Sequence, residues 1–320
     1  MGAVQSGRVQ ETLVVGETIV DMHPDGPGGL ADQEQFHRRP GGAPANVAVG
    51  LARLGTPPAF WTRLGADGFG DALAATLTDE GIPETLVVRD PDAPTGMAVV
   101  SLDADGDREF VLYLDGTAST RLQPGRVDDD RLAETAWLHV GGVELAHEPA
   151  RSAVLDLLER APPETTVSLD PNARPQLWTA FDYADTLDRV LPEVDVLVAS
   201  TEDLAPAGYD GPPASVASDI QAVGPHTVLL TRGAAGAVAH ATDAAPWGPA
   251  GTTHEGFTVD AVDTTGAGDA FTAGAVHALG EGESLANAVR FGNAVAARST
   301  TARGAMAALP TREAVASLLA

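Results

Sequence analysis

Asp263-Thr-Thr-Gly-Ala-Gly-Asp-Ala-Phe271 is the most informative stretch of this chain, because it places a glycine-rich turn directly before a helical pattern. Apolar residues at helical spacing predict that this helix runs over about 267–280. A turn of this kind leaves unpaired backbone N–H groups at the helix start, where the helix dipole is positive. Gly266, Ala267 and Gly268 are therefore predicted to bind an anion, such as a phosphoryl group in transfer.

Asp269 follows in the first turn of the same predicted helix. The helix dipole should keep its carboxylate ionised, so that it can accept the proton of an attacking hydroxyl. A base beside an anion site would bring the attacking oxygen and the transferred phosphorus together. The alternative is that Asp269 only complements the dipole and that the glycines only cap the helix.

The composition of the chain excludes several kinds of chemistry. It has 320 residues, no cysteine and no lysine, so that all 19 basic residues are arginine. Disulfides, thiolate metal sites and cysteine nucleophiles are excluded. The absence of lysine also excludes Walker A kinases, protein kinases and Schiff-base enzymes. Any phosphoryl transfer must therefore use backbone amides, arginine and metal ions.

The charge of the chain is strongly acidic, at −26. This balance argues against nucleic acid and against anionic membranes as partners. It predicts a cytoplasm at molar salt, as in a halophile, where salt screens the repulsion between carboxylates; the alternative is an ordinary acidic protein from a GC-rich genome. No apolar run approaches the roughly 18 residues of a membrane span, and the N-terminus lacks the pattern of a secretory signal. We therefore expect a soluble, cytoplasmic protein.

The order of the predicted elements indicates an α/β fold. A strand is expected over 12–20, and a helix from Pro44 to Leu54 that ends at Gly55. Two alternating segments, 95–102 and 108–114, predict an antiparallel hairpin with its turn at 103–106. Further strands are expected at 137–140, 166–169, 194–198 and 227–230, followed by helices at about 267–280 and 284–300.

This rhythm of strand and helix predicts a doubly wound, mostly parallel sheet with helices on both faces. No linker is long enough to separate independent domains. We expect one domain over 1–320, with a small β-sheet lid formed from segments of about 18–40 and 93–116.

Two blocks carry a resemblance to a known family. The stretch from Asp263 to Asp269 resembles the DTxGAGD signature of the ribokinase-like (PfkB) carbohydrate kinases, in which the last aspartate is the catalytic base. Gly41-Gly-Ala-Pro-Ala-Asn-Val-Ala48 resembles the N-terminal signature of that family in its fructokinase form. Together, in this order, the two blocks are specific. The resemblance implies a ribokinase-like fold that binds ATP and a sugar.

The resemblance extends to further stretches, among them Leu64–Gly70, 105–110 and Asp170-Pro-Asn-Ala-Arg174. It implies sugar contacts for a set of residues along the chain. A carboxylate or an amide can hold neighbouring hydroxyls, and glycines let the backbone approach a ligand. For the two arginines of this set, surface ion pairs are the alternative. The set is Asp21, Gly41, Gly42, Asn46, Arg108 and Arg174.

The resemblance also implies positions for nucleotide and metal ions. The nucleotide would contact Ser200, Thr231, Gly233, Gly236 and Asn293. A magnesium ion, held through water, is expected near Ser200-Thr-Glu-Asp203, where either Glu202 or Asp203 matches the usual glutamate. Asp263 and Thr265 match the positions that bind a monovalent cation, so potassium dependence is a further hypothesis.

The function expected from these residues is ATP-dependent phosphorylation of a primary hydroxyl of a small sugar. Fructose is preferred, and 2-keto-3-deoxygluconate, ribose or a nucleoside are the alternatives. A sugar sensor without turnover is a rival of another class. A dinucleotide dehydrogenase would need G-x-G-x-x-G after the first strand, which Val15-Gly-Glu-Thr18 does not supply. A homodimer through the lid is also expected.

Overall fold

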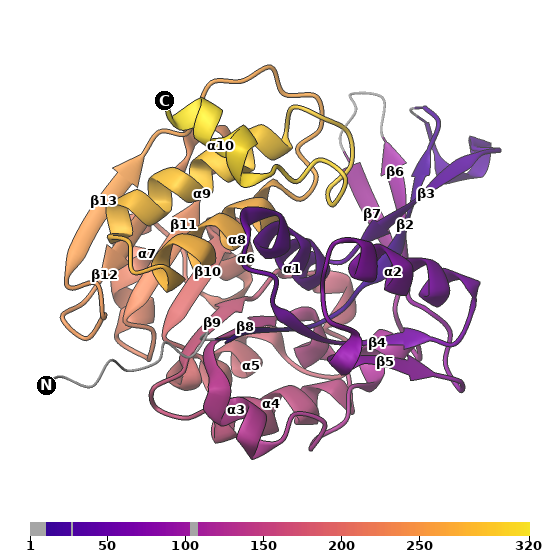
Figure 1. Cartoon of the computed structure of the whole chain (residues 1–320), viewed down its shortest axis with the longest axis horizontal. Coiled ribbons are helices and arrows are strands. Elements are labelled where there is room, and N and C mark those ends of the chain that lie inside the picture. The colour runs from indigo at the N-terminus through magenta and orange to yellow at the C-terminus, as the bar shows by residue number, and fades with distance from the viewer. Residues whose placement is uncertain (1–10, 27, 103–107) are drawn as a thin grey trace, which may run out of the picture.

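The computed structural model describes residues 11–26, 28–102 and 108–320. Within these residues the chain forms a nine-stranded sheet and a separate four-stranded sheet (Figure 1). None of the helices in this part of the chain is long and apolar enough to cross a membrane.

The nine-stranded sheet has the strand order β13-β12-β11-β10-β9-β8-β1-β4-β5. Strands β11 to β5 of this order run parallel, and β12 and β13 add an antiparallel edge. The strands are β1 (Glu11–Val15), β4 (Ala59–Gly65), β5 (Val87–Asp90), β8 (Thr135–Gly141), β9 (Thr166–Asp170), β10 (Val196–Ser200), β11 (Thr227–Thr231), β12 (Ala237–Ala241) and β13 (Ala250–His254).

The four-stranded sheet is the lid, with the order β3-β2-β6-β7. Strands β2 and β6 are parallel neighbours, and each pairs with its outer neighbour in antiparallel fashion. The strands are β2 (Ile19–Pro24), β3 (Phe36–Gly41), β6 (Met97–Leu102) and β7 (Arg108–Tyr113). In Figure 1 this sheet projects beside the N-terminal half of the large sheet.

Helices cover both faces of the large sheet (Figure 1). Helices α1, α8 and α9 pack on one face, and α4, α5 and α7 pack on the other. The helices are α1 (Ala43–Leu54), α2 (Gly68–Asp79), α3 (Asp129–Glu134), α4 (Ala150–Arg160), α5 (Tyr183–Val190), α6 (Thr201–Leu204), α7 (Pro213–Gln221), α8 (Ala267–Gly280), α9 (Leu285–Ser299) and α10 (Arg312–Leu319).

Strand β1 shows how the sequence builds this three-layer core. Leu13 and Val15 pack into the cluster on one face, whereas Val14 packs into the cluster on the other, and all three are fully buried. Side chains alternate across a strand, so a continuous apolar run is the pattern of a strand covered on both faces.

The predicted fold class is confirmed. Helix α1 ends at Leu54, where Gly55 has a left-handed backbone (φ 102°), and α8 and α9 lie where the apolar spacing predicts them. One expected strand, 12–20, is wrong. The chain leaves the large sheet after Val15 and enters the lid at Ile19, because an apolar run does not specify which sheet its residues join. The predicted turn at 103–106 lies outside the described residues.

Close packing between α8 and α9 yields a stability prediction. A Cβ at Gly274 would lie 2.9 Å from the Gly292 Cα and from the Val295 Cγ2, closer than atoms can pack. Gly274→Ala is therefore expected to lower the free energy of unfolding by about 1–3 kcal/mol, measured by urea denaturation. Gly280→Ala in the same helix, where a Cβ meets nothing within 4 Å, is the matched control and should be neutral or slightly stabilising. Equal effects of the two substitutions would contradict this packing argument.

Candidate active site

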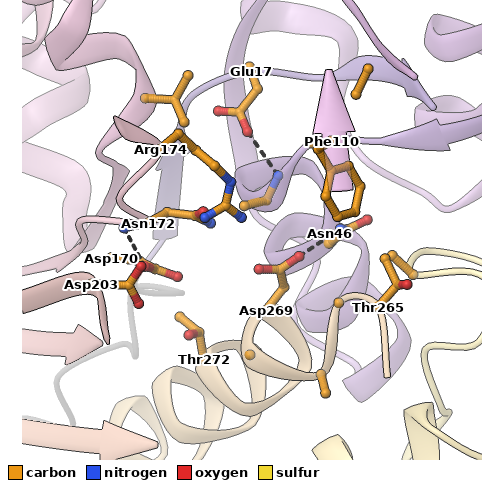
Figure 2. Close-up of a pocket in the computed structure, with 18 of the residues that line it drawn as sticks. Glu17, Asn46, Phe110, Asp170, Asn172, Arg174, Asp203, Thr265, Asp269 and Thr272 are labelled. Carbon is orange, nitrogen blue, oxygen red and sulfur yellow. Dashed lines mark hydrogen bonds between the residues drawn. The ribbon is translucent and has the colours of Figure 1, made fainter. Parts of the chain in front are cut away.

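A pocket of about 430 Å³ lies between the lid and the carboxyl ends of the parallel strands. Open α/β sheets bind ligands at this edge, because the loops that leave parallel strands converge there. The lid contributes Ile19, Asp21, Ala98, Phe110, Leu112 and Leu114 to its lining. Strand ends and the starts of α1 and α8 contribute most of the rest, including the polar residues labelled in Figure 2.

Asp269 and Asn46 meet inside this pocket. The Nδ2 of Asn46 donates a hydrogen bond of 2.7 Å to the Oδ2 of Asp269, and both side chains are buried (Figure 2). Burial raises the pKa of Asp269 to about 6, although the Asn46 hydrogen bond and the positive charge of Arg174 lower it. The carboxylate is therefore mostly ionised at pH values above about 6, but burial shifts its pKa upward, against the effect expected of the helix dipole. Such a pKa suits a general base.

The backbone at the start of α8 is the stretch that the sequence predicts to bind an anion. Gly266 has a left-handed backbone (φ 76°) and precedes the helix. A Cβ at this position would lie 2.6 Å from the Ala305 Cβ, so only glycine fits. The amide of Ala267 donates to the carbonyl of Thr264 at 3.2 Å, so this amide is partly used within the turn. The amide of Gly268 has no such partner among the described residues, and it lines the pocket. An anion here would contact the amide of Gly268 first.

Asp21 reaches the pocket from the lid and is 6% exposed. Burial raises its pKa, and together with the nearby charges of Asp269 and Glu17 it brings the pKa to about 7. Gly41 is required beside it, because a Cβ at this position would lie 2.2 Å from the Asp21 Oδ2. Gly42 (φ 102°) lies against the carbonyl oxygen of Glu17, which a Cβ would approach to 2.6 Å.

Glu17 and Glu144 are two buried carboxyl groups beneath the start of α1. Glu17 Oε1 accepts a hydrogen bond of 2.9 Å from the amide of Ala43, and Glu17 lines the pocket. Burial raises the pKa of Glu17 to about 7. Burial also raises the pKa of Glu144 well above its usual value, and the charge of Glu17 adds to this effect. Ionisation of Glu17 therefore disfavours ionisation of Glu144.

Asp170 ends β9, Asp203 lies in α6 directly after the neighbouring strand β10, and both line the pocket. Burial raises the pKa of Asp170 well above its usual value, with a further contribution from the charge of Asp203. Asp203 lies in the first turn of α6 and forms a capping box with the N-cap residue Ser200. Its Oδ2 accepts from the amide and hydroxyl of Ser200, and its Oδ1 accepts from the amide of Ala173. Figure 2 shows the side chain of Arg174 extending into the space between these two acids and Asp269.

The two acids fit a magnesium ion better than either does alone. Two carboxylates that line one pocket are an arrangement that suits a divalent cation. Because both Asp203 oxygens already accept hydrogen bonds, Asp203 suits contact with such an ion through water. Glu202 is exposed and does not line the pocket.

Four residues of the pocket lining each have a buried side-chain oxygen without a protein partner in the described residues. These oxygens are Glu17 Oε2, Asn46 Oδ1, Thr265 Oγ1 and Thr272 Oγ1. Buried polar groups are nearly always hydrogen-bonded, so a group of unsatisfied oxygens around one cavity indicates a polar ligand rich in hydroxyl groups or cations.

Asp263 connects the anion-binding turn to the segment around Gly304. Its Oδ1 accepts from the amide of Thr265 at 2.9 Å, and its Oδ2 accepts from the amide of Gly304 at 2.8 Å. The adjoining Thr265 hydroxyl is buried and has no partner among the described residues. A buried acid beside an unsatisfied oxygen fits a monovalent cation.

Other predicted residues lie outside the pocket. Gly233, Gly236 and Asn293 are not in its lining, whereas Ser200 and Thr231 are. Asn293 donates from Nδ2 to the carbonyl of Val289 in its own helix, and Gly236 allows a close approach of the chain at His254. Arg108 begins β7, but its side chain lies outside the described part of the structure.

The sequence analysis missed Glu17, Asp170 and Thr272 as pocket residues. A signal for Asp170 was present, because it ends the strand next to the one that leads to Ser200, and parallel neighbours place their carboxyl ends together.

Comparisons with known proteins agree with this geometry. Residues 9–312 match the model of the pfkB family carbohydrate kinases. The chain is 39% identical to a fructokinase of Klebsiella pneumoniae over 94% of its length and 96% of the relative. It superposes on the fructokinase of Xylella fastidiosa with bound ATP at a TM-score of 0.86 and 28% identity, covering 97% of this chain and 98% of that one.

A third comparison concerns a double mutant of the fructokinase from Vibrio cholerae O395, solved with fructose, ADP and a potassium ion. It has a TM-score of 0.82 and 31% identity, and it covers 99% of this chain and all of that one (100%).

The fold and the site define a sugar kinase, an enzyme that transfers a phosphoryl group to an alcohol. The chain belongs to the pfkB family of carbohydrate kinases, and within that family it is fructokinase-like. These comparisons do not support a halophilic origin, which stays a prediction from charge.

The carboxyl pair yields a prediction about stability and pH. Because the folded-state pKa of Glu144 is raised, its contribution is fully present below the unfolded pKa and is lost as the pH rises through the folded value. Glu144→Gln removes the ionisable group and therefore this loss. Between pH 5 and pH 8 the variant should lose roughly 1–3 kcal/mol less unfolding free energy than the native protein.

Thermal or urea unfolding at several pH values measures this difference. Glu164→Gln, which removes an exposed carboxyl, is the control and should leave the pH dependence as it is. A Glu144→Gln curve parallel to that of the native protein would show that Glu144 is ionised in the folded state.

Proposed function

We propose that this kinase transfers the γ-phosphoryl group of ATP to a primary hydroxyl of fructose, with Asp269 as the general base. The observation that carries the proposal is the position of the Asp269 carboxylate, one residue after the unpartnered Gly268 amide and inside the same pocket. A base and an anion site this close together can act on both atoms of the new bond: the base deprotonates the sugar oxygen, and the anion site stabilises the charge on the phosphoryl group.

Proton removal falls to one oxygen of the carboxylate. The Asn46 side chain donates to Oδ2, which leaves Oδ1 to accept the proton of the sugar hydroxyl. With a pKa of about 6, Asp269 is mostly ionised at pH 7 and above. The Gly268 amide and the positive end of α8 stabilise the negative charge of the transferred group.

The sugar would be oriented by oxygens that have no protein partner. Asn46 Oδ1 and Glu17 Oε2 are acceptors for sugar hydroxyls. Asp21 lies on the lid side of the pocket. Phe110 and Leu112 of the lid form an apolar wall. Such a wall excludes water that would otherwise accept the phosphoryl group.

ATP would lie along the strand ends, near Ser200, Thr231 and the turn at Thr264. A relative with bound ATP supports this donor. Asp170 and Asp203 would hold a magnesium ion, Asp203 through water. When bound, the ion neutralises phosphate charge. The previously predicted contacts of Gly233, Gly236 and Asn293 with the nucleotide lack support from the pocket lining.

Asp263 and Thr265 would hold a monovalent cation beside the anion site. The unsatisfied Thr265 hydroxyl supports this assignment, and a fructokinase relative was solved with a potassium ion. We further propose a homodimer through the lid and a cytoplasmic location.

Fructose is the preferred substrate because a relative at 39% identity is a fructokinase and a solved relative contains fructose. The test is ADP release from ATP and magnesium with fructose, glucose, ribose, 2-keto-3-deoxygluconate and adenosine, in potassium and in sodium salts. We expect the highest kcat/KM for fructose and faster turnover in potassium. A higher kcat/KM for another member of the panel would overturn fructose. A folded protein that binds sugar without turnover would be a sensor.

A further inference from the structure

The segment Leu64–Gly70 contributes nothing to the pocket, although it is one of the stretches that carry the family resemblance. It joins the end of β4 to the start of α2, and its Asp67 is the N-cap residue of that helix. Further along the chain, Thr95 lies between β5 of the large sheet and β6 of the lid. The segment contacts the chain there, because the Thr95 amide donates to Asp67.

The Asp67 carboxylate accepts hydrogen bonds both from the first turn of α2 and from Thr95, which precedes the lid strand β6. Its Oδ1 accepts from the amide of Gly70 at 2.8 Å and from the hydroxyl of Thr95 at 2.9 Å. Its Oδ2 accepts from the amide of Thr95 at 2.8 Å. The Thr95 hydroxyl in turn accepts from the amide of Gly65 at 3.2 Å. Burial works against ionisation, but these hydrogen bonds outweigh it and lower the pKa of Asp67.

The glycines of the segment leave room for this arrangement. A Cβ at Gly65 would lie 2.5 Å from the Thr95 amide nitrogen and 2.5 Å from the Asp67 Oδ2. A Cβ at Gly70 would lie 2.1 Å from the Gly65 carbonyl oxygen. The backbone segments are therefore in direct contact, and side chains at these two positions would push Thr95 away from Asp67.

Thr95 lies at the root of the hairpin β6–β7. The next residue, Gly96, accepts a hydrogen bond of 3.0 Å from the amide of Val20 in β2, and β6 starts at Met97. The chain returns from β7 beside the same point, where the amide of Ala118 donates to the carbonyl of Pro94 at 2.9 Å. Both ends of the hairpin are thus fixed within a few residues of Thr95.

This hairpin supplies the lid wall of the pocket through Ala98, Phe110 and Leu112. A small rotation at its root would move these side chains relative to Asp269. We propose that Asp67 is a positioning residue, which sets the orientation of the lid hairpin over the sugar by holding Thr95. In its effect on the sugar this inference rests on the proposed function.

The experiment compares two pairs of variants. Asp67→Asn replaces one acceptor oxygen with a donor, whereas Asp71→Asn removes the same charge from the same helix at an exposed side chain paired with Arg89. Thr95→Val removes the hydroxyl that Asp67 holds, whereas Thr95→Ser retains it. KM for the sugar should rise roughly tenfold in Asp67→Asn and Thr95→Val, with KM for ATP and kcat changed less than about threefold. The two controls should behave like the native enzyme.

A second measurement does not depend on catalysis. Hydrogen exchange followed by mass spectrometry should show faster exchange of β6 and β7 amides in Asp67→Asn, with β8 to β11 unchanged. This readout also applies if the native protein phosphorylates no sugar in the panel, so a failure of the proposed function is distinguished from a failure of this inference. Exchange that rises uniformly, or sugar KM values equal to that of the native enzyme, would overturn the positioning role and leave Asp67 as a helix cap alone.

Discussion

The hydrogen bond from Asn46 Nδ2 to Asp269 Oδ2 joins two parts of the chain that are 223 residues apart in sequence. Asn46 lies in the first turn of α1 and Asp269 in the first turn of α8. The two helices can bring these turns together because Gly50 of α1 faces Ala273 of α8, where a Cβ at Gly50 would lie 2.6 Å from the Ala273 Cβ. The relative positions of Asp269, the glycine turn before it and the Asn46 side chain thus depend on the contact between α1 and α8.

The second constraint on the site is electrostatic. Glu17, Asp21, Asp170, Asp203 and Asp269 surround a pocket whose described lining contains one basic side chain, Arg174. Burial raises the pKa of all of these acids except Asp203. In each case the negative charge of a neighbouring acid also makes ionisation less favourable. A cluster of this kind is costly to fold without ligands. Sugar hydroxyls and cations are ligands that would reduce this cost.

The parts of the fold that could be predicted are those with local signals. Helix α1 has a proline in its first turn and Gly55 at its end, and α8 starts at a glycine turn, so their bounds follow from short-range chemistry. Strand β3 could not be predicted, because His37, Arg38 and Arg39 make it resemble a loop. It is an edge strand of the lid, where exposed side chains need no apolar pattern. The place of Asp269 beside the glycine turn could be predicted from its helix position, whereas the carboxyl pair of Glu17 and Glu144 depends on burial that only the tertiary structure creates.

The central claim is that Asp269 removes the proton from the sugar hydroxyl, and Asp269→Asn tests it most directly. The substitution preserves shape and the contact with Asn46 while it removes the base. Turnover should be measured beside the dissociation constants of sugar and ATP in the same preparation. We predict a fall in kcat of roughly 10²- to 10⁴-fold with both dissociation constants nearly unchanged. A loss of less than about tenfold in kcat would contradict the assignment of the base.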